Sequence, residues 1–338
     1  MHIKRFSLII SVFVVVMLAF SAQASTVSYA QDSKIAAHKA TVMQFMDAFA
    51  HSDKLATLDS ITAKGYVDYS PQGKTDLASI KAGAESFIKA MPDINYKTLI
   101  VIANEEWAAL RYEQTGTFTN ALVSADGSSL PPTGKPVLLT GNVLVKFDAE
   151  SKIEATWEAY DQLSFAVQFG AMPAMDGGAA LPPPDASIWQ ITPTSADAMT
   201  AMETQIKAVI DQAWNKGDLS VVDSALDPAW IGYPTYANPQ AFKDDITNSR
   251  AAMPDIKVTV DPIVIEGNWA AFHLSYTGTF THDLTVPGMN IKATNKPVSL
   301  EGIIFLTTNQ AGKVIAEWDE FDNYSFLVQV GVIPAPAK

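Results

Sequence analysis

The segment KIEATWEAYDQLSFAVQFGAMP, residues 152–173, decides the fold because it recurs later in the chain. Residues 313–334 read KVIAEWDEFDNYSFLVQVGVIP and are identical to it at ten of 22 positions, where unrelated sequences would share about one or two. Two shorter motifs recur at nearly the same separation along the chain: Met-Pro-Asp at 91–93 recurs at 253–255, and Thr-Gly-Thr at 115–117 recurs at 277–279. The chain therefore contains two copies of one domain.

The repeat divides the 338 residues into two domains and a linker. We predict domains over residues 32–173 and 198–338, joined by a Pro- and Gly-rich linker over residues 174–197. Gly177-Gly178 and the three prolines at 182–184 cannot continue a helix or a strand ladder. Trp189 and Ile191 in the same segment are large apolar residues that could dock on a neighbouring domain.

Each copy begins with helical periodicity and continues with strands. Apolar residues recur every three or four positions near the start of both copies, which is typical of an amphipathic helix. These residues are Val42, Phe45, Met46 and Phe49, then Ile206, Val209, Ile210 and Trp214. After each Met-Pro-Asp corner the sequence alternates and is rich in β-branched and aromatic residues. The sequence thus predicts an α+β fold in two tandem domains.

The first residues predict export. Lys4 and Arg5 precede an apolar run at residues 8–20, and the small residues Ala22 and Ala24 follow it. This is the layout of a signal peptide, and the run is shorter than the roughly 20 residues of a spanning helix. We predict a signal peptide over residues 1–24, with an alternative end at residue 30. The mature protein is then periplasmic or secreted, with no stable membrane anchor after cleavage.

Composition argues against several classes of partner. The formal net charge is −13, there is no cysteine, and there are only five histidines. Nucleic acid binding depends on basic patches, so we expect no nucleic acid partner. The histidines show no metal-ligand spacing, and no Gly-rich phosphate loop follows a strand. We therefore expect no metal and no cofactor.

One face of the last strand in each copy is largely apolar until a carboxylate ends the series. The two series are Ile153, Ala155, Trp157, Ala159, Asp161 and Val314, Ala316, Trp318, Glu320, Asp322. If this face lines a pocket, desolvation raises the pKa of the terminal Asp toward the range of a general acid or base. The alternative is that Asp161 and Asp322 cap the short helices that follow them, which is the commoner role of such residues.

An earlier strand, residues 107–114, also has two distinct faces. Ala108, Leu110, Tyr112 and Gln114 share one parity, and this mainly apolar face is predicted to meet the helices. The opposite face mixes aromatic and polar groups, which suits contact between the sheets of the two domains. Its residues are Trp107, Arg111 and Glu113, matched in the second copy by Trp269, His273 and Ser275.

Both copies resemble the SnoaL-like polyketide cyclases, or ester cyclases, of the nuclear-transport-factor-two-like superfamily. The resemblance rests on PPTGKPV at 131–137, Lys152-Ile153, Trp157, Asp161 and Gln168-Phe169-Gly170, with a diverged version in the second copy. It implies a cone of curved antiparallel sheet, wrapped by N-terminal helices around a pocket. It also implies a cofactor-free aldol closure in which an Asp at the positions of Asp161 and Asp322 acts as acid and base.

The chain departs from the family pattern at polar pocket positions. The family often has His after Thr-Gly-Thr, where this chain has Phe118 and Phe280. Family members also tend to have Glu-His just before the Trp, where this chain has Ala155-Thr156 and Ala316-Glu317.

Three functional hypotheses follow. The first is an envelope protein that binds, and cyclises, isomerises or hydrolyses, a small hydrophobic carbonyl compound, with Asp161 and Asp322 as catalytic groups. Its predicted substrate-binding residues are Trp157, Trp318, Tyr112, Gln168, Gln329 and Glu320; the aromatic ones could equally be core. The second is a non-catalytic periplasmic or secreted module that binds a small hydrophobic molecule. The third is structural: the second copy covers the sheet of the first as an intramolecular pseudo-dimer, with a homodimer as the alternative assembly.

Overall fold

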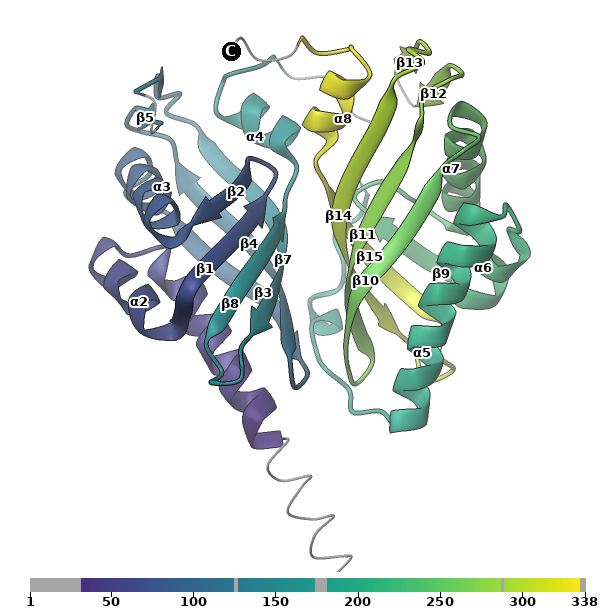
Figure 1. The fold of residues 1–338 in the computed structure, drawn as a ribbon, viewed down its shortest axis with the longest axis horizontal. Helices are drawn as coiled ribbons and strands as arrows, with labels where there is room; N and C mark the ends of the chain where they lie inside the picture. Colours follow the sequence, from purple (N-terminus) through teal and green to yellow (C-terminus); the bar gives the residue numbers. More distant parts are fainter. Residues whose placement is uncertain (1–31, 125–126, 174–180, 287–288, 335–338) are drawn as a thin grey trace, which may run out of the picture.

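The computed structural model describes residues 32–124, 127–173, 181–286 and 289–334. It contains two α+β domains that lie side by side, with their sheets facing each other and most of their helices on the outside (Figure 1). The predicted fold class is confirmed. The predicted signal peptide lies outside the described residues, as does the first part of the linker.

The first domain opens with a helix over residues 32–48. Its predicted apolar positions, such as Val42 and Phe45, are buried in the domain core. The remaining elements are η1 (Ser52–Thr57), α2 (Leu58–Ile61), β1 (Thr62–Ser70), β2 (Gly73–Asp76), α3 (Leu77–Ala90), β3 (Asn95–Ala103), β4 (Trp107–Thr117), β5 (Leu122–Val123), β6 (Ser129–Leu130), β7 (Pro136–Phe147), β8 (Ile153–Ala159) and α4 (Gln162–Gln168).

The second domain follows a short 3-10 turn, η2 (Ala186–Ile188), in the linker, and has a similar order of elements without a counterpart of β2 among the described residues. Its elements are α5 (Ala196–Ala208), the π-helical turn η3 (Val209–Asn215), α6 (Ser220–Ala225), β9 (Leu226–Tyr233), α7 (Pro239–Ala252), β10 (Lys257–Glu266), β11 (Trp269–Thr279), β12 (Leu284–Val286), β13 (Met289–Ile291), β14 (Pro297–Thr308), β15 (Val314–Phe321) and α8 (Asn323–Gln329). Within the described ranges, no helix has the length and apolar composition needed to cross a membrane.

The two main sheets share one topology. Among the described residues, strand order is β2-β1-β8-β7-β4-β3 in the first domain and β10-β11-β14-β15-β9 in the second. Neighbouring strands are antiparallel except for β1 with β8 and β9 with β15, which are parallel. Register shifts interrupt several pairs in both sheets, and such bulges bend a sheet.

The repeated Met-Pro-Asp and Thr-Gly-Thr motifs hold a corner together. Asp93 accepts hydrogen bonds from the backbone N–H and the hydroxyl of Thr117, both at 2.7 Å, and Asp255 does the same with Thr279 at 2.7 Å. A Cβ on Gly116 would lie only 3.3 Å from Met91, so a larger residue there would have to displace Met91 by a few tenths of an ångström. These motifs are therefore part of the scaffold.

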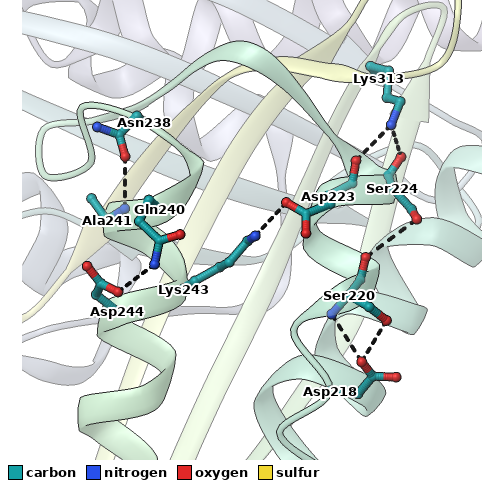
Figure 2. Close-up of polar contacts among 10 residues, drawn as sticks. All are labelled: Asp218, Ser220, Asp223, Ser224, Asn238, Gln240, Ala241, Lys243, Asp244 and Lys313. Carbon is teal, nitrogen blue, oxygen red and sulfur yellow. Dashed lines mark hydrogen bonds and ion pairs between the residues drawn. The ribbon is translucent and has the colours of Figure 1, made fainter.

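The repeated lysine at the start of the last strand fastens a helix to the sheet. Lys313 donates to the backbone carbonyls of Asp223, at 3.0 Å, and Ser224 at the end of α6 (Figure 2). Lys152 makes the matching contact with the carbonyl of Ser60 in the first domain. These bonds satisfy carbonyls that a helix terminus leaves free.

The two sheets pack face to face through a mixed aromatic and polar contact. Trp107, Trp157, Trp269 and Trp318 belong to one apolar cluster that spans both domains. The linker adds Trp189, whose ring lies 4.4 Å from that of Trp318.

A buried polar network crosses the same contact. Arg111 donates to Glu320 at 2.9 Å and to Asn142 at 2.8 Å, and Asn142 donates to the carbonyl of Ile303 at 2.7 Å. The predicted sheet-to-sheet face thus does join the domains.

Candidate functional site

The first domain contains a partly open cavity of about 220 Å³ between its sheet and its helices. Part of the lining is apolar and includes Phe45, Phe49, Phe87 and Val143; the polar part includes Asp68, Gln114, Thr156, Glu158 and Tyr160. An apolar pocket with a few polar groups is the usual form of a small-molecule site.

Glu158 is the central polar group of this cavity. The hydroxyl of Tyr112 on β4 donates to its Oε1 at 2.6 Å. Burial raises the pKa of Glu158 to about 7, and the charge of Asp68 adds to this, while the hydrogen bond from Tyr112 opposes it. A carboxyl with this pKa is present in both protonation states at neutral pH and can accept or donate a proton.

A second carboxyl lies in the same lining. Asp68 on β1 pairs with Thr156 on the neighbouring parallel strand β8, and the Thr156 hydroxyl donates to Asp68 Oδ1 at 2.6 Å. The hydroxyls of Tyr66 and Thr156 are 2.5 Å apart, which extends the hydrogen-bonded chain. Burial raises the pKa of Asp68.

Tyr112 reaches Glu158 because glycine lies opposite it. Tyr112 pairs with Gly141 of β7, and a Cβ on Gly141 would lie 2.5 Å from the Tyr112 hydroxyl oxygen. No larger residue fits beside the ring in this position. The structure thus places Tyr112, a predicted substrate-binding residue, in the cavity.

Gln114, two positions along the same face of β4, has a free donor. Its side chain is 6% exposed, lines the cavity, and its Nε2 has no hydrogen-bond partner among the described residues. An unsatisfied buried amide costs free energy, so a bound molecule with an acceptor oxygen would stabilise it.

The apolar series predicted to line the pocket from the last strand does not do so. Ile153 lies in the domain core, whereas Trp157 and Ala159 face the other domain. The cause is a register shift in β8: Ile153 pairs with Phe147 and Ala155 with Lys146, so one extra residue reverses the alternation.

Because of the same register shift, the side chains of the other set of alternate residues in β8 point into the cavity. Thr156, Glu158 and Tyr160 therefore line it. In the second domain, Val314 pairs with Thr308 and Ala316 with Thr307, so the bulge recurs there.

Asp161 and Asp322 are helix caps. Asp161 accepts from the backbone N–H of Leu163 at 3.0 Å, and Asp322 from that of Ser325 at 3.1 Å, so the capping interpretation is confirmed. Their helices, α4 and α8, lie side by side above the contact between the domains (Figure 1).

Neither carboxyl lines the cavity of its own domain. Asp322 lines a groove between the domains that also contains Trp157, and Asp161 lines a hollow of the second domain. Burial raises the pKa of Asp161. An acid/base role for the two residues stays a prediction.

The other predicted binding residues have structural partners. Trp157 and Trp318 stack on tyrosines at the domain contact, with ring distances of 5.1 and 5.6 Å. The Gln168 amide exchanges two 2.8 Å bonds with the backbone of Leu138. Gln329 does the same with Ser299 at 2.8 and 2.9 Å, so both glutamines join the last helix to the sheet. Glu320 is held by Arg111 across the domain contact.

The interior of the second domain is different. Gly232 stands opposite Glu317, where the first domain has Asp68 opposite Thr156. Aromatic side chains fill the position, since a Cβ on Gly232 would lie 2.7 Å from Trp230 and Tyr236. The inner hollow measures only about 60 Å³. The two copies therefore share a scaffold and differ in their chemistry.

The chain is similar to one family model and to several solved structures. The family model described as SnoaL-like polyketide cyclase matches residues 40–169 and 204–330. Among solved structures, AclR from Streptomyces galilaeus is 22% identical, over 41% of this chain and 87% of its own, with a TM-score of 0.36. TsrD from Streptomyces laurentii is 20% identical over 41% and 99%, with a TM-score of 0.36. A SnoaL-like polyketide cyclase from Agrobacterium tumefaciens is 17% identical over 39% and 98%, with a TM-score of 0.32. A search of curated proteins found no match.

The fold is that of an α+β protein of two tandem domains, with a polar cavity between the sheet and the helices of the first. Because the two matched regions cover most of the sequence, the chain belongs to the SnoaL-like polyketide cyclase family, with two copies of the family domain in one polypeptide.

Proposed function

We propose that the first domain performs cofactor-free proton transfer on a small hydrophobic carbonyl compound, with Glu158 as the acid/base group. The observation that carries this proposal is the part-buried hydrogen bond from Tyr112 to Glu158 in the cavity lining. Burial raises the pKa of Glu158 to about 7, even though this hydrogen bond lowers it. The proposal moves the catalytic role from Asp161 and Asp322 to a residue that lines the cavity.

The chemistry follows from the groups in the lining. Ionised Glu158 would take a proton from the carbon next to the carbonyl, and the electron pair of the broken C–H bond would move onto the carbonyl oxygen. The free Nε2 of Gln114 would donate to that developing oxyanion. Return of the proton at another carbon isomerises the compound, and attack of the carbanion on a second carbonyl cyclises it. A water activated by Glu158 would instead hydrolyse an ester.

The second candidate function is ligand binding without turnover. It is favoured by Phe118, which occupies the position where the family often has His and is fully buried against Phe169 at a ring distance of 4.7 Å.

We further propose, from the predicted signal peptide, that the protein acts in the periplasm or outside the cell. Immunoblotting of cell fractions tests this, and retention of the full-length chain in the cytoplasm would contradict it.

Exchange of carbon-bound protons with D₂O tests catalysis before any product is known. We would follow benzoylacetone, phenylacetone and ethyl acetoacetate by ¹H NMR with the full chain. We expect Glu158→Gln to slow the catalysed exchange by about 100-fold or more, in line with general acid/base contributions. Glu154→Gln is the matched control, because Glu154 is an exposed residue of the same strand.

The outcomes separate the alternatives. Wild-type rates in Glu158→Gln would contradict the proposal, and a loss in Asp161→Asn alone would return the role to Asp161. Binding of these compounds without any catalysed exchange in the wild-type protein would favour the non-catalytic module.

A further inference from the structure

The second domain contains a cavity with different walls. An inner hollow of about 60 Å³ and an outer one of about 290 Å³ share part of their lining, and together they are called here the domain 2 cavity. The shared residues are Trp214, Tyr236, Tyr276, Asp319 and Phe321.

The domain 2 cavity is strongly acidic. Its outer part is lined by Asp161, Asp245, Asp319 and Glu320, and its inner part by Glu317, while no Lys, Arg or His of the described residues lines either part. Glu320 alone among these carboxylates has an ion-pair partner in the described ranges, Arg111 at 2.9 Å. The other carboxyls have no counter-ion among the described residues of the cavity walls.

Asp319 shares a side-chain hydrogen bond with Glu317 and keeps one oxygen without a partner among the described residues. Its Oδ1 is buried and has no hydrogen-bond partner among the residues that the structure describes. Burial, together with the charges of Glu317, Glu320 and Asp245, raises the pKa of Asp319 well above its usual range. A carboxyl in this environment keeps its proton until a positive group comes close enough to favour the charged form.

The rest of the wall is aromatic. The rings of Trp214 and Tyr276 meet edge to face at 4.9 Å, and Phe321 lies 5.6 Å from Tyr276. Aromatic faces attract cations, and aromatic rings with a carboxylate recognise ammonium groups. The described residues contain no group of three or more His, Cys, Asp or Glu placed to hold one metal ion, so the arrangement favours an organic cation.

We propose that the domain 2 cavity binds an organic cation, either a protonated amine or a quaternary ammonium compound, with Asp319 as its counter-ion and the aromatic rings as its walls. Asp161 reaches this cavity from the first domain, so the site is built by both domains. It requires a charged ligand, whereas the first-domain cavity is proposed to take a neutral carbonyl compound. One function can therefore fail without the other.

Wild-type binding is the first test. Choline and 2-phenylethylammonium would be titrated into the full chain by isothermal calorimetry, alongside 3,3-dimethylbutan-1-ol, which has the shape of choline without its charge. We expect choline to bind at least about tenfold more tightly than the neutral alcohol. Equal affinities, or no binding of either cation, would overturn the proposal.

Variants then locate the site. Asp319→Asn keeps the shape and removes the charge, and we expect it to weaken cation binding about tenfold or more. Asp244→Asn is the control, because Asp244 is an exposed residue of α7 that bonds to Gln240 outside the cavity (Figure 2); we expect no change there. An equal loss in both variants, or a loss in Glu158→Gln with Asp319→Asn unchanged, would overturn the assignment. Circular dichroism at the titration temperature confirms that each variant is folded.

Discussion

The charge of Glu158 should destabilise the folded protein above neutral pH. Burial raises its pKa from 4.5 to about 7, so the folded protein binds its proton more tightly than the unfolded chain does. At 1.36 kcal/mol per pKa unit, the resulting cost is at most about 3 kcal/mol above pH 7. The cost is absent below pH 4.5, because Glu158 is then protonated in both the folded and the unfolded protein. It grows as the pH rises from 4.5 to 7.

Glu158→Gln removes this titration while it keeps an acceptor for the Tyr112 hydroxyl. We expect the stability of the variant relative to wild type, measured as the difference between their free energies of unfolding, to be about 2 kcal/mol greater at pH 8 than at pH 5. Urea unfolding followed by circular dichroism at both pH values measures this. Glu154→Gln, the exposed control, should show little change with pH. A difference between Glu158→Gln and wild type that is the same at both pH values would refute the reasoning.

Three further predictions concern the groups around this site. Tyr112→Phe removes the hydrogen bond that stabilises the charged form of Glu158, so its pKa should rise by about one unit; ¹³C NMR would show this, and an unchanged pKa would contradict it. Gly141→Ala should displace the Tyr112 ring and slow proton exchange on the carbonyl probes, and wild-type exchange rates would show that the close contact is unimportant. Arg111→Ala leaves Glu320 buried without its cation and should cost about 3–5 kcal/mol in urea unfolding, whereas a loss below about 1 kcal/mol would mean that the pair contributes little.

The scaffold was predictable from the sequence because both copies keep it. The motifs that revealed the repeat are those that hold the corner, such as Asp93 with Thr117, and those that fasten helices to the sheet, such as Lys313 and Gln329. The side chains of these motifs form hydrogen bonds to the backbone, so the motifs indicate the fold. Most residues of the candidate sites differ between the copies, so a repeat does not reveal them.

The cavity face of the last strand could not be predicted for a physical reason. Alternation was counted from Ile153, but the extra residue before Ala155 reverses it, and a bulge of this kind leaves no clear mark in a single sequence. A pattern that alternates from Ile153 therefore misses Glu158. Glu317 and Asp319 of the second copy align with Thr156 and Glu158 of the first. These two charged residues are the signal that polar groups of the last strand face the interior in both domains.

Direct titration of Glu158 tests the central claim. The ¹³C carboxyl resonance of Glu158, assigned by its loss in Glu158→Gln, would be followed from pH 3 to pH 9 in the full chain. A midpoint near pH 7 is predicted for a carboxyl enclosed in the first-domain cavity. A midpoint near 4.5, the value of an ordinary glutamate, would contradict the assignment of this cavity as a proton-transfer site.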